Sequence, residues 1–527
     1  MDPVEGELSS WSTLAQRWAR AVDAASDATF LEYERSDGDT AAWTYGEFSE
    51  VVERARHAIS GFGLRAGDRL QLVLPNCPAF IAVMLAAAQS GIVFLSSDPR
   101  STADELGRQA DRVEPALAIC GSDQIEAYRK SGSAAPVIVV DPNDTTLSAL
   151  HGNSDGELEP VSPAPLDTLG LMFTSGTTSL PKIVEITQAN YAFAGDVMAA
   201  ASGLRAGSRF LVVLPLFHAN AQYYSLSASI SVGGTVILAR GFSASRFLEQ
   251  AERFQATHAS LFAAPMRMIL ARAKPAPISL PLEHLWFSQN LTDDEYERFA
   301  TLVGCRPRQI YGMTETAPAV LMSRRLDPPR TTIGTPTLGC HVRLRDPETG
   351  EPVDIDEVGE IQTGGYPGLS LFAGYRDNQE AFAGAIAETL DDGFVWFKTG
   401  DLGRLDTDGE VTFVGRGADI LKVAGENVSV VEVESAIVEH PDVLDAAVVG
   451  MPDPLLDEVP IAFVVPVEGV ASTFADELSE WCSRRLSGPR CPREIHIVEE
   501  LPRTAVGKIQ RFRLTQGMAA PHQAGQA

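Results

Sequence analysis

The pattern that most constrains this chain is a repeated alternation of amphipathic helices and short apolar strands. Helical periodicity over residues 43–62 gives way to the strand-like RLQLVLP at 69–75, then to a helix through MLAAAQSG and another apolar run, IVFLSS. The same alternation continues through LVVLPLF, TVILAR and FLEQAERFQ. Chains of this order build mostly parallel sheets with helices on both faces. The sequence therefore predicts a large α/β body.

The pattern changes near residue 340, where short strands alternate with Gly and Asp turns. HVRLRDPETGEPV and DLGRLDTDGEVTFVG contain the hairpin-type connections DPETGE and DTDGE. A compact segment of helices and strands follows. We therefore predict an N-terminal domain over 1–417 with a β-rich subdomain at about 340–417, a mobile α+β C-terminal domain over 418–517, and a tail over 518–527.

The acidic balance of the chain restricts its partners. Its 527 residues include 70 acidic and 42 basic side chains, for a formal net charge of −28. Such a surface repels a phosphate backbone and an anionic membrane, which argues against nucleic acid or membrane as the main partner. Lysine is scarce, so each one is a candidate for a specific role. The lysines are Lys130, Lys182, Lys274, Lys398, Lys422 and Lys508.

Cysteine use and the ends of the chain predict a cytoplasmic protein. The six cysteines are scattered and form neither a paired metal-binding pattern nor a small secreted framework. The first ten residues are acidic and polar, unlike a signal peptide. The longest apolar stretch, from Ala79 to Leu95, is interrupted by Gln89, Ser90 and Gly91. It predicts a buried helix that runs into a strand rather than a membrane span.

The segment TSGTTSLPK at 174–182 carries the sharpest chemical signal. It follows the apolar LGLMF and offers a flexible turn, five hydroxyls and one lysine. Backbone amides and hydroxyls can donate to phosphate oxygens, and the lysine adds charge. It is not a P-loop motif, and a Ser/Thr-rich surface loop is the alternative for this segment alone. The candidate ATP-binding residues here are Thr174, Ser175, Gly176, Thr177, Thr178 and Lys182.

This loop resembles the phosphate-binding motif of the adenylate-forming superfamily of acyl-CoA synthetases, luciferases and peptide-synthetase adenylation domains. The likeness extends over nearly the whole chain, because further motifs stand in the family's order: LPLFHANAQ, IYGMTET, VGEIQTGG, FKTGD to GRGAD, and PRTAVGKIQR. The chain differs where Ser179 and Ile183 replace usual glycines and Gln188 replaces a usual histidine. The resemblance implies that the protein uses ATP, Mg²⁺ and coenzyme A, forms an acyl-adenylate and releases AMP and pyrophosphate.

The resemblance also implies roles in the nucleotide pocket. Tyr311 would stack on adenine, Thr314 would contact phosphate, and Glu315 would hold Mg²⁺. The remaining ATP-binding candidates are Ser288 and Gln309, which would line the pocket, Asp401, which would accept the ribose hydroxyls, and Arg416, which would bind ribose or phosphate.

Two lysines beyond residue 417 are assigned to the two half-reactions by the same resemblance. Lys508, in PRTAVGK, would bridge the substrate carboxylate and the α-phosphate during adenylation. Lys422 would contact the adenylate during thioester formation, after the C-terminal domain rotates. Ala424 and Gly425 would lie along the channel for the pantetheine arm of CoA. The hinge departs from the family's usual pattern, with Ala418 before Asp419.

The acid-binding candidates lie in LPLFHANAQYYS. His218 matches a residue that lies over the acyl pocket in relatives, with a neutral core histidine as the alternative. Amino-acid adenylation domains carry an aspartate nearby, and this chain does not. The sequence most resembles the carnitine and crotonobetaine CoA ligase branch, but Asn220 stands where that branch has Asp.

Loss of that anion, together with Tyr223 and Tyr224, favours an aromatic or other bulky uncharged acid. Three alternatives to this hypothesis stay open. They are a betaine-type or fatty acid, transfer of the acyl group to a carrier protein instead of free CoA, and a binding module without catalysis. Luciferase-like oxidation is more distant.

Overall fold

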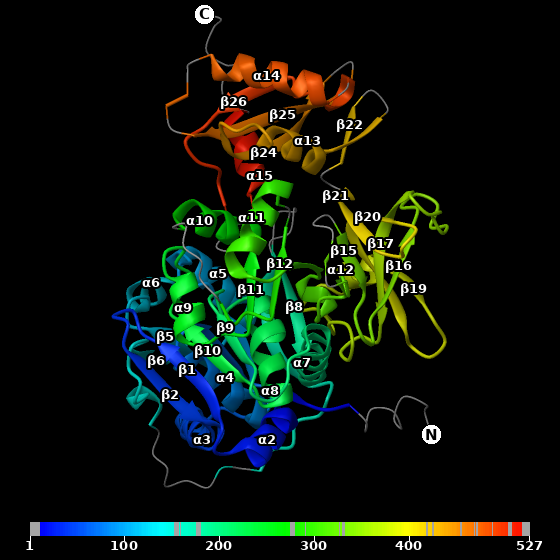
Figure 1. Cartoon of the computed structure of the whole chain (residues 1–527). Helices are drawn as coiled ribbons and strands as arrows, with labels where there is room; N and C mark the ends of the chain where they lie inside the picture. Colours follow the sequence, from blue (N-terminus) through cyan, green and yellow to red (C-terminus); the bar gives the residue numbers. More distant parts are fainter. Residues whose placement is uncertain are drawn as a thin grey trace, which may run out of the picture.

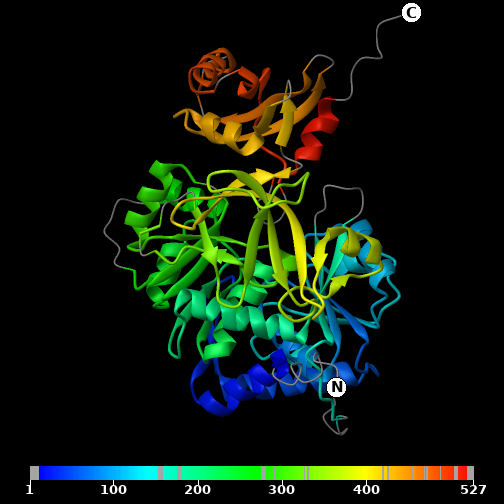
Figure 2. The ribbon, with the colours of Figure 1, turned by 90° about the vertical axis from the view of Figure 1, so that its right-hand side faces the viewer.

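The computed structural model describes residues 11–151, 158, 160–174, 181–273, 280–289, 291–325, 327–328, 332–417, 420–423, 426–453, 456–467, 469–470, 473–486, 488–503 and 509–518. Figure 1 shows the segment beyond residue 420 at one end of the molecule and helices α2 and α3 at the opposite end, and Figure 2 shows the same arrangement after a quarter turn. The strands from β16 to β21 lie along one side of the large body.

A seven-stranded sheet forms one layer of the body, in the order β18-β8-β7-β4-β3-β5-β6. The strands from β7 to β6 in this order pair in parallel, while β8 and β18 are antiparallel additions at one edge. The bounds are β3 Arg69–Val73, β4 Val93–Ser96, β5 Leu117–Gly121, β6 Val137–Val140, β7 Thr168–Thr174, β8 Lys182–Thr187 and β18 Gly374–Tyr375.

A second sheet contains 14 strands among the described residues and changes character along its length. From β1 through β10, β9, β11 and β12 to β13 it is parallel, and from β13 onward it is antiparallel. The parallel part comprises β1 Thr29–Glu34, β9 Arg209–Val212, β10 Thr235–Ala239, β11 His258–Phe262, β12 His284–Ser288 and β13 Arg308–Tyr311, with β2 Thr40–Thr44 antiparallel at the edge.

The antiparallel part of this sheet is built from hairpins, as the Gly and Asp turns of the sequence predict. It comprises β14 Leu321–Met322, β15 Thr332–Pro336, β16 His341–Arg345, β17 Val358–Gly365, β19 Ile386–Thr389, β20 Val395–Leu405 and β21 Val411–Arg416. The family's mixed α/β architecture, predicted from the sequence, is confirmed.

Helices begin where the sequence supplies caps. Thr44 caps α3 and Thr187 caps α7, each in a reciprocal capping box that satisfies backbone amides at the start of the helix. The helices of the body are α2 Leu14–Ala25, α3 Tyr45–Ser60, α4 Pro78–Ser90, α5 Ala103–Val113, α6 Ile125–Lys130, α7 Gln188–Ser202, α8 Ala228–Val232, α9 Phe247–Arg253, α10 Ala263–Arg272, α11 Asp293–Val303 and α12 Gln379–Ala385.

The core of the body lies between the two large sheets. Helix α4 is buried from Pro78 through Ala88 and runs into β4, which confirms the helix-to-strand interpretation of the longest apolar stretch. One hydrophobic cluster joins α4 to α7 and to the irregular helix that follows β9. Gln188, which replaces the family's usual histidine, is buried and donates from Nε2 to the carbonyl of Ala88 at 2.7 Å, so it ties α7 to α4.

The segment beyond residue 420 forms a five-stranded sheet with helices. Its elements are β22 Ile420–Val423, β23 Glu426–Ser429, α13 Val430–Val438, β24 Val443–Asp453, β25 Asp457–Pro466, α14 Phe474–Arg485, β26 Glu494–Ile497 and α15 Arg511–Met518. It has its own buried cluster, which includes Val433, Val448 and Leu478. Within the described ranges, no helix is long and apolar enough to cross a bilayer.

Candidate active site

The two ends of the predicted phosphate loop lie side by side. Thr174 ends β7, Lys182 begins β8, and the two residues are paired opposite each other in the antiparallel ladder. The residues between them, including Ser175, Gly176, Thr177 and Thr178, lie outside the described part of the chain. The ladder therefore places Lys182 at the end of the loop that its sequence assigns to phosphate.

Lys182 and Glu315 converge on one tyrosine. The ammonium of Lys182 lies over the ring of Tyr375, with Nζ 4.3 Å from the ring centroid. The hydroxyl of Tyr375 donates to Oε1 of Glu315 at 3.1 Å. Burial, followed by the Glu315 charge, raises the pKa of Tyr375, so the hydroxyl stays protonated and remains a donor. The candidate phosphate lysine and the candidate metal ligand, 133 positions apart in the numbering, thus lie at the same place.

Sequence analysis missed Tyr375. It lies on the two-residue strand β18, which pairs with β8, so Tyr375 faces Val184 across the ladder. Nothing in a short GY segment signals that pairing, because the partner strand is nearly two hundred residues away. Only the fold brings this aromatic ring to the phosphate lysine.

The ribose candidates form a second cluster. The Tyr311 hydroxyl donates to Oδ2 of Asp401 at 2.8 Å, and Nε of Arg416 lies 3.0 Å from Oδ1 of the same carboxylate. Asp401 and Arg416 are paired across β20 and β21, and Asp401 is buried. Burial raises the pKa of Tyr311 well above its ordinary value, and the Asp401 charge adds to this effect. A buried carboxylate held by one hydrogen bond and one ion pair keeps lone pairs that can accept from hydroxyl groups.

Two strand ends complete this side of the site. Ser288 ends β12 and Gln309 lies on the adjacent parallel strand β13. Nε2 of Gln309 donates to the carbonyl of Gln289 at 3.1 Å. Gln289 has φ of 77°, a strained conformation for a residue with a side chain. Ligands of α/β sheets bind outside the carboxyl ends of parallel strands, and Ser288 lies at such an end.

Thr314 and Glu315 begin a short 3-10 turn after β13. Thr314 is half-buried and Glu315 is buried. Ala317, two residues after Glu315, has a φ of 61°, which is also a strained backbone conformation. The turn is fixed further by the amide of Phe372, which donates to the Glu315 carbonyl at 3.1 Å.

The acid-binding candidates lie on an unusual helix. Residues Asn220–Ser227 form a π-helix, a rare element that occurs mostly at functional sites. His218 is half-buried just before it, and its ring lies 4.3 Å from that of Phe217 between centroids. Asn220 is buried, and its Oδ1 has no hydrogen-bond partner among the described residues.

The two tyrosines of this helix play different parts. Tyr223 is fully buried, donates from its hydroxyl to the sulfur of Met172 at 3.3 Å, and packs edge-on against Tyr191. It is part of the core wall. The Tyr224 hydroxyl lies so close to Gly312 that an added Cβ there would meet it at 2.7 Å. The acid-binding candidates and the IYGMTET segment are therefore in direct contact.

The candidates beyond residue 417 are only partly described. Lys508, Ala424, Gly425, Ala418 and Asp419 lie outside the described residues. Lys422 lies on β22, where its backbone pairs with that of Asn427 on β23. The structure therefore shows the strand that carries Lys422 but places neither lysine side chain.

A divalent cation fits the Glu315 environment. Among the described side chains, no group of three or more His, Cys, Asp or Glu residues could hold a metal ion alone. Mg²⁺ is usually held by one or two carboxylates together with substrate phosphates and water. Glu315 would supply one such carboxylate, and nucleotide phosphates bound at the candidate phosphate lysine Lys182 would supply further oxygens.

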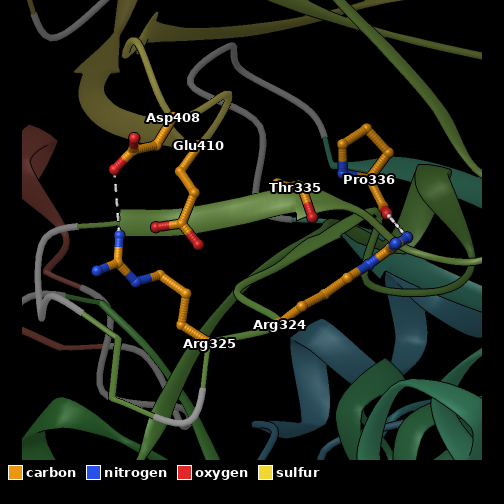
Figure 3. Close-up of a pocket in the computed structure, with 6 residues that line it drawn as sticks. All are labelled: Arg324, Arg325, Thr335, Pro336, Asp408 and Glu410. Atoms are coloured by element: carbon orange, nitrogen blue, oxygen red, sulfur yellow. Dashed lines mark hydrogen bonds and ion pairs between the residues drawn. The ribbon is translucent and has the colours of Figure 1, made fainter.

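A cavity with a volume of about 630 Å³ lies elsewhere, and none of the candidate residues lines it (Figure 3). In it, Arg325 pairs with Asp408 at 3.3 Å and Arg324 donates to the Pro336 carbonyl at 2.9 Å. Its two guanidinium groups are already engaged with the protein, so the candidate site rests on the strand ends rather than on this cavity.

The fold and the site are those of a nucleotide-binding α/β enzyme. The chain matches the AMP-binding enzyme family over residues 18–376 and the AMP-binding enzyme C-terminal domain over residues 432–508. It belongs to the AMP-binding enzyme family.

Relatives and solved structures resemble it along nearly the whole length. A crotonobetaine/carnitine–CoA ligase of Salmonella choleraesuis is 32% identical over 97% of this chain and 99% of its own. A benzoate CoA ligase from Burkholderia xenovorans is 25% identical, with a TM-score of 0.83 over 95% of this chain and 99% of its own. An o-succinylbenzoate CoA synthetase from Bacillus subtilis, bound to ATP and magnesium, is 25% identical, with a TM-score of 0.81 over 95% and 99% of the two chains.

Proposed function

We propose that the protein is an ATP-dependent carboxylic acid–CoA ligase that forms an acyl-adenylate and whose acid is aromatic or otherwise bulky and uncharged. The observation that carries this proposal is a set of three local contacts among the candidate residues. The phosphate lysine and Glu315 meet at Tyr375, the ribose carboxylate Asp401 holds Tyr311 and Arg416, and Tyr224 joins the π-helix to Gly312. Nucleotide and acid would thus lie next to each other.

In the first half-reaction the acid's carboxylate attacks the α-phosphate of ATP, and pyrophosphate leaves. Lys182 stabilises the negative charge that develops on the phosphates, and Asp401 fixes the ribose, so the reacting atoms are held in line. Glu315 would hold Mg²⁺, which would supply positive charge to stabilise the leaving pyrophosphate. Lys508 adds charge at the α-phosphate.

In the second half-reaction the thiol of CoA attacks the acyl carbon, and AMP leaves. We assign Lys422, Ala424 and Gly425 to this step. We also propose that residues 1–417 and 418–517 act as two domains that rotate relative to each other between the half-reactions. The supply of ATP and CoA in the cytoplasm, and the six free cysteines, favour a cytoplasmic location.

The side chains of the π-helix favour an uncharged carboxylic acid as the substrate. Its side chains from Asn220 to Ser227 include no charged group, and Asn220 is a neutral amide with a buried, unpartnered oxygen among the described residues. A quaternary ammonium would be stabilised by an anion or an aromatic cage. The benzoate and o-succinylbenzoate enzymes, which resemble this chain in structure, support an aromatic acid.

A betaine-type acid is the second candidate, because the relative at 32% identity is a crotonobetaine/carnitine–CoA ligase. The test is an assay for AMP and pyrophosphate with ATP, Mg²⁺, CoA and a panel of aromatic, fatty and betaine acids, with products identified by mass. We expect AMP and an aryl-CoA. Turnover only with carnitine-like acids would overturn the acid class and leave the chemistry intact.

The acceptor is tested in the same assay. A phosphopantetheine-bearing carrier protein delivers the same thiol as CoA, so both are offered at equal concentration. We expect transfer to free CoA. A strong preference for the carrier protein would identify an acyl-AMP ligase that loads such proteins, and silence with every acid would leave only a nucleotide-binding module.

A further inference from the structure

We propose that Tyr375 is a positioning residue that keeps the phosphate lysine Lys182 and the metal ligand Glu315 apart and fixes each of them for Mg²⁺–ATP. The inference rests on the proposed function, since it assigns Lys182 to phosphate and Glu315 to magnesium. It adds a residue that is not one of the motif positions.

The ring of Tyr375 and the side chain of Lys182 are neighbours on one face of the sheet. Tyr375 stands opposite Val184 in the ladder, and Lys182 lies two residues from Val184 on the same strand. Side chains two residues apart on a strand point to the same face, so Lys182 and Tyr375 are diagonal neighbours. The ammonium lies 4.3 Å from the ring centroid, a distance at which a cation is attracted to the face of the ring.

The hydroxyl of Tyr375 holds Glu315 from the other end. It donates to Oε1 at 3.1 Å, while the amide of Phe372, three residues earlier on the same segment, donates to the Glu315 carbonyl. Side chain and backbone of Glu315 are thus fixed by the same short stretch of chain. A buried carboxylate held in this way keeps one orientation toward a bound ion.

Lys182 and Glu315 bring opposite charges into one small site. An ammonium and a carboxylate this near would pair with each other, and that pair would compete with phosphate and Mg²⁺ for both groups. Among the described residues no ion pair joins Lys182 to a carboxylate; Tyr375 engages the two charges separately, with Lys182 over the face of its ring and Glu315 at its hydroxyl. Tyr375 therefore preserves two charges for the substrate that would otherwise neutralise each other.

Two substitutions separate the two contacts. Tyr375→Phe keeps the ring under Lys182 and removes only the hydroxyl. Tyr375→Leu removes both contacts and opens a path for direct pairing of Lys182 with Glu315. The matched control is Tyr45→Phe, which deletes another buried hydroxyl that donates to the carbonyl of Gly234 at 2.7 Å, outside the candidate site.

The experiment measures binding of α,β-methylene-ATP by calorimetry, with and without Mg²⁺, on the full-length variants. For Tyr375→Phe we expect the Mg²⁺ concentration that gives half-maximal tightening to rise about tenfold, with Mg²⁺-free binding unchanged. For Tyr375→Leu we expect Mg²⁺-free binding to weaken about tenfold as well. Tyr45→Phe should change neither quantity, and unfolding curves of all variants report any loss of the fold.

A double-mutant cycle makes the assignment specific. In a Glu315→Gln background the Tyr375→Phe substitution should no longer shift the Mg²⁺ dependence, because the partner of the hydroxyl has lost its charge. A folded Tyr375→Phe variant with the wild-type Mg²⁺ dependence would overturn the inference alone. A wild-type protein that binds no Mg²⁺–ATP would instead overturn the proposed function. If Tyr375→Leu fails to fold, the Tyr375→Phe result decides.

Discussion

The nucleotide region and the segment that carries the two candidate catalytic lysines are built on different plans. In the nucleotide region each functional group touches another: Tyr311 and Arg416 share the carboxylate of Asp401, and Lys182 and Glu315 share Tyr375. These contacts fix the groups before a substrate arrives, which is how electrostatic catalysis avoids reorganisation during the reaction.

In the C-terminal segment, the described contacts hold the residues on either side of 504–508. Arg503 pairs with Asp445, its backbone bridges Ile509, and the amide of Gln510 donates to the Pro502 carbonyl at 2.7 Å. On the far side, Nη2 of Arg511 lies 2.8 and 3.0 Å from the two carboxylate oxygens of Glu434. The residues that flank 504–508 are thus anchored within their own segment. These contacts are compatible with the proposed delivery of Lys508 by domain rotation.

The largest expected effect comes from removing Lys508. Lys508→Ala should slow adenylate formation by about 100- to 1000-fold, the usual cost of one group that stabilises transition-state charge. It should spare thioester formation from a supplied acyl-adenylate, because we assign that step to Lys422. Pyrophosphate exchange and CoA-dependent release of AMP measure the two half-reactions separately.

Lys422→Ala is the matched variant, and we expect it to slow thioester formation and to spare adenylate formation. Equal loss of both half-reactions in either variant would refute the division of labour between the lysines. It would also remove the functional reason for the difference between the two regions.

A second effect tests the shared carboxylate. Asp401→Asn leaves the Tyr311 hydroxyl and the Arg416 guanidinium without their anion in a buried place. We expect an unfolding free energy lower by about 2 kcal/mol and ATP binding weaker by about 30-fold. Chemical denaturation and calorimetry measure the two quantities.

Asp37→Asn is the control for that substitution, because Asp37 pairs with Arg35 at 2.9 Å on the exposed surface and should change neither quantity measurably. A stability loss in Asp401→Asn without weaker ATP binding would make Asp401 a structural residue. The nucleotide region would then be less preorganised than its contacts indicate.

The sequence predicted the family, the α/β fold and the β-rich hairpins, because each depends on local patterns. Motif order identified the family, and helical or strand periodicity identified elements such as α3, α4 and β3. Those predictions are confirmed by the family match and by the fold. The roles assigned to individual site residues stay predictions.

What the sequence could not supply is long-range pairing. Tyr375 is invisible as a site residue until β18 pairs with β8. The π-helix over Asn220–Ser227 was not predicted either, because all of its residues are buried and the segment shows no one-sided apolar pattern from which its helical period could be determined. The contacts of Tyr223 with Met172 and Tyr191 could likewise not be predicted from the sequence.

A smaller effect tests the anchor of the Lys508 loop. Arg511→Met removes the ion pair with Glu434 while keeping much of the side-chain volume. We expect adenylation about tenfold slower, since a small misplacement of a catalytic group is costly. ATP binding should be unchanged, because the nucleotide region is held independently.

Arg490→Met provides the comparison for that anchor. Arg490 also pairs with a carboxylate of α13, Glu432, at 3.2 Å, but both side chains are exposed. It should leave adenylation unchanged. Weaker ATP binding in Arg511→Met would contradict the separation of the two regions.

The smallest expected effect is a loss of stability at low pH. His284 is buried next to His258 at the start of β12, and burial, followed by the Arg308 charge, lowers its pKa to about 3 from an ordinary 6.5. Its neutral form is therefore favoured in the folded state. The stability that depends on this form is complete above pH 6.5 and is lost as pH falls from 6.5 toward 3, because the unfolded chain takes up the proton first. Between pH 6.5 and 5.5 the loss is about 1 kcal/mol.

His284→Phe should remove that part of the acid sensitivity and keep the aromatic volume beside Trp286. Hydrogen exchange locates the effect: on acidification, peptides of β11 and β12 should lose protection earlier in the wild-type protein than in the variant. Peptides of β24 and β25 belong to the other region and should show no difference between the two proteins. If peptides of β24 and β25 also lost protection earlier in the wild-type protein than in the His284→Phe variant, the two regions would unfold as one cooperative unit. Any independence of the C-terminal segment would then have to arise from the hinge alone and not from separate hydrophobic cores.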